Sequence, residues 1–297
     1  MSHQVFNMKN YISLLSIILT ITSCDIEEGM YNENYNSYVN PDKKVLIEDF
    51  TGHKCPNCPN AAKELEIIHD IYGNQIIGMA IHVSSFAKPS PIGNSFDYDF
   101  RTKWGDDWDE FYGISLAGLP RGMINRTGFG DDSHKLGKDE WGTVVANELK
   151  KQIDFKISIS SNPADSTISI ASVVQNNINS EYNLVVCLTE SNIINWQKDG
   201  QLNVEDYVHN HVLRTVLIDK PLSNSTNYVA GQHIEETINY NLTDLEEDNV
   251  FYSENTAEMG NGNAGGWNKE NMKIVAYIYN KNTKEVVQVE EANLITK

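Results

Sequence analysis

The stretch Val45-Leu-Ile-Glu-Asp-Phe-Thr-Gly-His-Lys-Cys-Pro-Asn-Cys-Pro59 decides how the first half of the chain is expected to fold. A run of β-forming residues ends at Thr51-Gly52, and two cysteines, Cys55 and Cys58, follow it just before a helical pattern. The unpaired N–H groups at a helix start carry partial positive charge, which stabilises a thiolate. The attacking cysteine of a Cys-x-x-Cys pair can therefore have a pKa as low as roughly 3.5–7. A strand that delivers two cysteines to a helix start is typical of redox chemistry.

The elements around this stretch continue in the order strand, helix, strand. The predicted helix has one apolar face, formed by Ala61, Leu65, Ile68 and Tyr72. Residues 75–83 are a mostly apolar run of strand length, which calls for a parallel pair with a right-handed crossover. The other elements expected in this half are a cover helix (96–112), a short strand after Pro120 and a closing helix (138–153).

The hydrophobic period changes in the second half, from Asp154 onward. Phe155, Ile157 and Ile159 alternate with polar residues, which is the pattern of a half-buried strand. Further apolar or alternating runs lie near 183–189, 207–218, 233–240, 273–279 and 285–292. Without intervening helices, these runs predict an antiparallel, immunoglobulin-like sandwich of about seven strands, with Glu246–Asp248 in a loop.

The N-terminus has the pattern of a secretion signal. A basic residue, Lys9, precedes a short apolar run that ends in Ile21-Thr-Ser-Cys24. These four residues resemble a bacterial lipobox, so residues 1–23 are the expected signal peptide and Cys24 the expected site of lipid attachment. The alternative is an ordinary signal with an incidental Cys24. The polar, Asn-rich residues up to position 42 predict a flexible tether (24–42) between a membrane anchor and the fold.

Composition limits the classes of partner. The chain has 297 residues and a formal net charge of −18. An acidic surface repels phosphate backbones, so we expect no nucleic-acid partner. The acidic residues that follow Cys24 resemble the surface-export signals of Bacteroidetes lipoproteins, although a charge run is more often a solvated tether.

Residues 43–152 resemble thioredoxin in four features: the strand before the cysteines, the pair at the helix start, the strand–helix–strand order, and a Gly-x-Pro that opens a later strand. The resemblance implies that Pro120 is cis and faces the disulfide. It also implies that Asp49, six residues before Cys55, is buried and relays a proton to and from Cys58. The sequence departs from the family at Lys54, at Pro56-Asn57 between the cysteines and at Leu119, which leaves the substrate and the redox potential open.

Most of residues 24–297 further resemble the Omp-twenty-eight family, the 28-kilodalton-type outer-membrane lipoproteins of Bacteroidetes. The residues that carry this resemblance are Glu48–Pro59 and Tyr207–Arg214. It implies an outer-membrane location, with exposure at the cell surface as a further expectation. A thioredoxin-like domain (43–152) followed by the β-sandwich (153–297) fits this family.

The cysteine pair has three interpretations: a redox pair, a structural disulfide or a metal site. Zinc would need two further ligands, and covalent haem attachment would need a histidine at position 59, which is proline. We therefore expect no metal and no cofactor. Cys187, in an apolar run, is expected to be a buried, inert thiol. His53 and Lys54 either lower the pKa of the thiolate or form a solvated turn.

His209 and His211 alternate on a predicted strand and would share a face. They could seed a metal site, but a polar strand face is the commoner outcome, and no cysteine lies at a useful spacing.

Two functions remain open. In the first, the protein is a thiol–disulfide oxidoreductase of the cell envelope, with Cys55 as nucleophile, Cys58 as resolving cysteine and a thiol or disulfide protein as partner. In the second, it is not an enzyme: the thioredoxin fold is a scaffold, and the β-sandwich binds a surface ligand or partner. An accessible Cys55 in a groove beside Pro120 favours the first function, and a covered pair favours the second.

Overall fold

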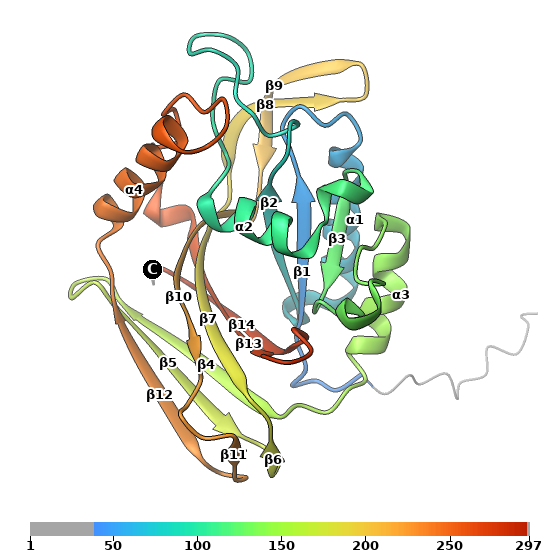
Figure 1. Cartoon of the computed structure of the whole chain (residues 1–297), viewed down its shortest axis with the longest axis vertical. Helices are drawn as coiled ribbons and strands as arrows, with labels where there is room; N and C mark the ends of the chain where they lie inside the picture. The colour runs from blue at the N-terminus through green and yellow to red at the C-terminus, as the bar shows by residue number, and fades with distance from the viewer. Residues whose placement is uncertain (1–38, 296–297) are drawn as a thin grey trace, which may run out of the picture. The chain divides into compact units, whose positions relative to one another are not determined.

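The computed structural model describes residues 39–295 (Figure 1). The expected signal peptide, Cys24 and most of the expected tether lie outside the described residues. The helices are α1 (Cys58–Tyr72), α2 (Lys103–Tyr112), α3 (Lys138–Glu148) and α4 (Leu242–Asn255). The strands are β1 (Val45–Thr51), β2 (Ile76–His82), β3 (Arg121–Ile124), β4 (Phe155–Asn162), β5 (Thr167–Val174), β6 (Ile178–Asn179), β7 (Tyr182–Glu190), β8 (Ile193–Asp199), β9 (Leu202–His209), β10 (Val212–Pro221), β11 (Asn227–Tyr228), β12 (His233–Asn239), β13 (Met272–Asn280) and β14 (Val286–Asn293).

A seven-stranded sheet in the order β14-β13-β7-β10-β2-β1-β3 organises the fold. β1 and β2 are parallel, as the strand–helix–strand pattern predicted, and β3 is antiparallel to β1. The two halves of the chain meet within this sheet, because β10 pairs with β2 in parallel at Val212 and Ala80. Next to this pair, the N–H of Ala80 donates to the carbonyl of His211 over 2.8 Å. The predicted boundary at 152/153 therefore falls between α3 and β4 in the chain, while the sheet itself runs across both halves.

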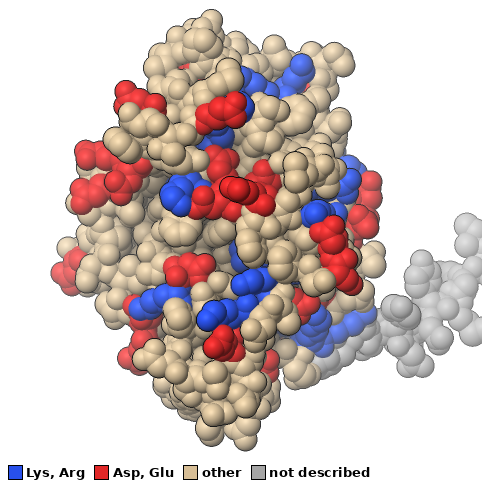
Figure 2. Space-filling model, in the orientation of Figure 1, with Lys and Arg blue, Asp and Glu red and all other residues tan. Residues whose placement is uncertain are grey.

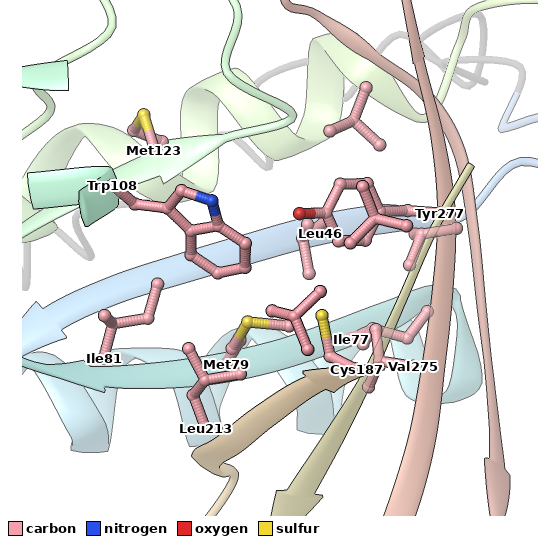
Figure 3. Packing of buried hydrophobic residues seen from close by; sticks show 14 of the residues in the cluster. Leu46, Ile77, Met79, Ile81, Trp108, Met123, Cys187, Leu213, Val275 and Tyr277 are labelled. Atoms are coloured by element: carbon pink, nitrogen blue, oxygen red, sulfur yellow. The ribbon is translucent and has the colours of Figure 1, made fainter. Parts of the chain in front are cut away.

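Both faces of β1 are buried. Leu46 and Phe50 point to one face, which α2 covers, and Val45 and Ile47 point to the other, which α1 and α3 cover. Figure 3 shows the first face, where Cys187 and Tyr277 of the second half pack with Leu46, Ile77 and Met79 of the first. Because this core draws on both halves, each half supplies apolar surface that the other needs.

The second core lies between two sheets. The three-stranded sheet β12-β5-β4 packs against β7 and β13 through alternating apolar residues such as Ile157, Ile170, Val186 and Ile274. The alternation predicted for this half is confirmed. The described chain is thus a mixed α/β fold with large β-sheets, two of which face each other as in a sandwich.

Two helical predictions need correction. Glu246–Asp248, predicted as a loop, lies inside α4, which begins where the Asn241 side chain accepts a hydrogen bond from the N–H of Thr243. The cover helix predicted from residue 96 begins only at Lys103. Thr102 is its N-cap, and Phe96 has a φ of 64°, which lies outside the right-handed helical region. No helix in residues 39–295 is both long and apolar enough to cross a membrane.

Candidate redox site

The cysteine pair lies between the end of β1 and the first turn of α1. The strand ends at Thr51, a turn follows in which the N–H of Cys55 donates to the carbonyl of Gly52 over 2.9 Å, and α1 begins at Cys58. Pro59 fits the first helical turn because the N–H that it lacks would have no partner there. Cys55 and Cys58 form a disulfide, with their Cα atoms 5.4 Å apart. Cys187 is a free, fully buried thiol, as expected, and burial raises its pKa.

A β-hairpin covers this disulfide. The hairpin consists of β8 and β9 (residues 193–209) and is called the cover hairpin below; Figure 1 shows it at the end of the sheet where α1 starts. The N–H of Lys198 donates to the carbonyl of His53, and that of Gly200 donates to the carbonyl of Pro56, both over 2.8 Å. As a result, Cys55 is 1% exposed and Cys58 is 2% exposed.

Gln197 provides the side-chain contact between the cover hairpin and the disulfide turn. It is buried, and its Nε2 donates to the carbonyl of Cys55 over 3.1 Å. One sequence signal indicates this hairpin: Asp199-Gly200 is a turn-like pair, and β8 ends at Asp199 with Gly200 in the turn. Its position over the cysteines could not be predicted, because local sequence says nothing of where a hairpin docks.

Asp49 is buried beside Cys58. Its side chain is on the face of β1 that α1 covers, it is 2% exposed, and burial raises its pKa to about 7. No group in residues 39–295 hydrogen-bonds its Oδ1. Asp49 and Cys58 line a cavity of about 50 Å³ together with His82 and Gln197. A volume of this size accommodates water, which needs only about 10–15 Å³.

Glu48, the neighbour of Asp49, is buried as well, on the opposite face of β1. It pairs with Arg126 over 2.6 Å, and Arg126 also donates to the hydroxyl groups of Tyr112 and Tyr277. Because successive side chains of a strand point to opposite faces, Glu48 and Asp49 lie on opposite sides of the sheet. The structure buries both, because helices cover both faces of the sheet.

Three neutral histidines lie close to the disulfide turn. His53, His82 and His209 are all buried, with the rings of His53 and His82 6.4 Å apart and those of His82 and His209 5.6 Å apart. Burial lowers the pKa of His53 to about 3 and that of His209 to about 4. His53 is therefore neutral and adds no positive charge beside the cysteines, and it is not part of a solvated turn.

The predicted His209–His211 face is wrong. β9 ends at His209, and His211 has a φ of 57° in the link to β10, so the two do not alternate on one strand. No group of three or more His, Cys, Asp or Glu in residues 39–295 could hold a metal ion.

Pro120 lies at the same end of the sheet as the disulfide turn. Its peptide bond with Leu119 is cis, and the next residue, Arg121, pairs with Phe50 of β1. Pro120 is half-buried and is not among the residues that line the cavity beside Asp49. Of the predicted site residues, the structure thus brings Asp49, Cys55 and Cys58 together and places Pro120 at the neighbouring strand.

A family model described as outer membrane protein Omp28 matches residues 107–297, about two thirds of the chain. The chain belongs to the Omp28 outer membrane protein family. Membership places it at the outer membrane, as the sequence predicted. The match begins in α2, so it includes the cover hairpin, the three-stranded sheet and the strands β7 and β13 that face it, but not the cysteine pair.

Two solved structures share the fold. HBP35 of Porphyromonas gingivalis matches with a TM-score of 0.56 and 14% identity, over 85% of this chain and 76% of that one. A protein from Agrobacterium tumefaciens matches with a TM-score of 0.52 and 12% identity, over 86% and 96% of the two chains. A domain of the outer membrane lipoprotein Omp28 from Porphyromonas gingivalis is 16% identical over 48% of this chain and 90% of that one, with a TM-score of 0.26. A comparison with curated proteins gave no match.

Proposed function

We propose that this protein is an outer-membrane lipoprotein that binds a partner or ligand without being an enzyme, and that Cys55–Cys58 is a structural disulfide. The observation that carries the proposal is the burial of both cysteines beneath the cover hairpin. Thiol–disulfide exchange begins when a thiolate reaches one of the two sulfurs in line. The cover hairpin occupies the approach that such a thiolate would need.

A thioredoxin-like first half is part of this proposal. The parallel β1–β2 pair, the disulfide at the start of α1, the antiparallel β3 and the cis Leu119–Pro120 bond support it. In the proposed role this half is a scaffold: its sheet continues into β10 and β7, so it holds the second half in a fixed position. The disulfide then fixes the turn on which the cover hairpin rests.

The rate at which the disulfide is reduced tests the proposal. The full chain, kept in detergent, is treated with dithiothreitol and a maleimide, and the labelled Cys55–Cys58 peptide is quantified by mass spectrometry. Three hydrogen bonds of 3.1 Å or less hold the cover hairpin on the turn, each worth about 1 kcal/mol. We expect reduction roughly 100-fold slower in the folded chain than in urea. Equal rates in the two states would contradict a covered, structural disulfide.

Thiol–disulfide exchange remains the second candidate, and one observation favours it. A structural disulfide has no use for a buried carboxyl group with a pKa of about 7, yet Asp49 lines the cavity beside Cys58. Such a carboxyl group suits proton transfer to a leaving thiolate.

In this second mechanism the cover hairpin first lifts. A substrate thiolate attacks the sulfur of Cys55, the disulfide bond breaks, and Cys58 leaves as a thiolate that takes the proton of Asp49. A second substrate thiolate then attacks the substrate sulfur of the mixed disulfide and releases Cys55. The substrate dithiol is oxidised to a disulfide, and the protein gains the two electrons.

A further inference from the structure

A cleft between α2 and α4, floored by β10, lies apart from the disulfide. It is called the α2–α4 cleft below, and its volume of about 470 Å³ falls within the range of roughly 300–1,000 Å³ that is usual for small-ligand sites. Its lining includes Lys103 and Trp104 of α2, Thr215 of β10, and Asp248, Asn249 and Phe251 of α4. The proposed binding function requires a ligand site. The α2–α4 cleft has enough room for a small ligand.

Two aromatic side chains line opposite walls of the cleft. Trp104 on α2 is half-buried, and Phe251 on α4 is 63% exposed. A phenylalanine that is exposed to this degree leaves most of its apolar surface in water, and a ligand that buried this surface would gain free energy. A ligand with a flat apolar face would cover both rings.

Two uncharged polar side chains line the cleft. Asn249 is 7% exposed and Thr215 is 9% exposed, and both line the cleft. Neither side chain is among the fully enclosed polar atoms that lack a partner within residues 39–295, so the polar atoms of both are accessible from the cleft. A ligand that brings its own donors and acceptors would satisfy them.

The charges around the cleft argue against an anionic ligand. Lys103 pairs with Asp107, and Arg214, also at the cleft, pairs with Glu190 over 2.7 Å, so both cations are already neutralised. Asp248, an exposed carboxylate, also lines the cleft. Figure 2 shows acidic and basic side chains interspersed on the face that it views, so the surface there is not strongly basic. A phosphate or carboxylate would meet repulsion here, whereas hydroxyl groups would find acceptors.

We propose that the α2–α4 cleft binds a neutral saccharide. The C–H face of a sugar ring would lie on Trp104 and Phe251, while its hydroxyl groups bond to Asn249, Thr215 and Asp248. A saccharide combines an apolar face with a rim of uncharged donors and acceptors, which is the combination that the cleft offers. This inference rests on the proposed binding role, for which it names the ligand class.

The test uses the full chain in a detergent whose head group is not a sugar. Maltohexaose, cellohexaose, xylohexaose, mannohexaose and chitohexaose are titrated separately, with tryptophan fluorescence and calorimetry as readouts. We expect at least one of them to bind with a Kd below about 1 mM. Trp104→Ala and Phe251→Ala should each weaken that binding at least tenfold, about 1.4 kcal/mol. Phe111→Ala is the matched control, because Phe111 is an exposed aromatic residue of α2 that does not line the cleft.

Phe251→Ala keeps the test valid even if Trp104→Ala fails to fold, because Phe251 is largely exposed. The inference is overturned if none of the five probes binds, if hexagalacturonic acid alone binds, or if Phe251→Ala binds as the unmodified chain does. The saccharide titrations and the reduction of the disulfide test separate claims. If the Cys55–Cys58 pair is reduced slowly but no saccharide binds, the ligand class is wrong while the proposed function is still supported.

Discussion

The side chain of Gln197 donates a hydrogen bond of 3.1 Å to the main-chain oxygen of Cys55, although 142 positions separate the two residues in the chain. Through this bond the second half of the protein holds the disulfide turn of the first. The cover hairpin therefore decides whether the sulfurs can be reached.

Loosening the cover hairpin should expose the disulfide. Gln197→Ala removes the side-chain hydrogen bond to Cys55 and leaves the two main-chain bonds in place. Since one such bond is worth about 1 kcal/mol, we expect reduction by dithiothreitol to become roughly fivefold faster. Gln201→Ala, at the exposed turn of the same hairpin, is the matched control and should leave the rate unchanged. Identical rates for both variants would show that Gln197 does not hold the cover.

Asp49 should make the protein less stable as the pH rises. Its pKa is about 7 in the folded chain and about 4 when unfolded, so the folded state holds a proton that the unfolded state loses between these values. The stability that the protonated Asp49 carboxyl group provides is fully present below pH 4 and disappears as the pH rises towards 7. The free energy of unfolding of Asp49→Asn, taken relative to that of the unmodified chain, should therefore be roughly 2–3 kcal/mol higher at pH 8 than at pH 5.

The measurement for Asp49 is urea unfolding of both proteins at the two pH values. Asp70→Asn, at an exposed position of α1, controls for the loss of one surface charge. A constant difference between Asp49→Asn and the unmodified chain would mean that Asp49 is not held protonated.

The buried histidines should have the opposite effect on stability: they should make the protein less stable as the pH falls. His53 has a pKa of about 3 when folded against about 6.5 when unfolded, so the unfolded state alone binds the proton in between. Above pH 6.5 His53 is neutral in both states and costs no stability. As the pH falls below 6.5, protonation of His53 in the unfolded state lowers the free energy of unfolding. His53→Phe, which can stack on Phe96 as His53 does, should reduce the loss of stability between pH 7 and pH 4 by roughly 3 kcal/mol.

Unfolding by urea at pH 7 and pH 4 checks this prediction, with His69→Phe on the exposed side of α1 as control. If His53→Phe loses as much stability on acidification as the unmodified chain, the imidazole is charged in the folded protein.

The Glu48–Arg126 pair should be costly to break. Both side chains are fully buried, and Arg126 links β1 to Tyr277 of β13. Glu48→Ala leaves an uncompensated buried guanidinium, so we expect a loss of about 3–5 kcal/mol in the free energy of unfolding. Asp107→Ala, which breaks an exposed pair on α2, should cost less than about 1 kcal/mol. Similar losses for the two variants, measured by urea unfolding, would contradict this.

Local sequence predicts the first half well. The apolar run of β1, the helical face from Ala61 to Tyr72 and the second apolar run are complete within about forty residues, and each element contacts its neighbour in the chain. The resemblance to thioredoxin implies a buried Asp49, six residues before Cys55, and Asp49 is buried in the structure.

The arrangement of the second half could not be predicted in the same way. The Val212–Ala80 pairing joins residues 132 positions apart, and no local pattern encodes such a partner. α4 carries the acidic run Glu246–Asp248, whose polarity resembles that of a loop, while its N-cap Asn241 is a weak signal by itself. The α2–α4 cleft depends on both elements, so it too is visible only in the folded chain.

The reduction potential of Cys55–Cys58 tests the central claim most directly. The full chain in detergent is equilibrated in dithiothreitol buffers of graded ratio, and the oxidised fraction is measured after thiol alkylation. A structural disulfide predicts a potential below about −300 mV, with neither cysteine alkylated until the chain is reduced. A potential between about −270 and −120 mV, with Cys55 alkylated selectively near neutral pH, would contradict the account and establish thiol–disulfide exchange as the function of the site.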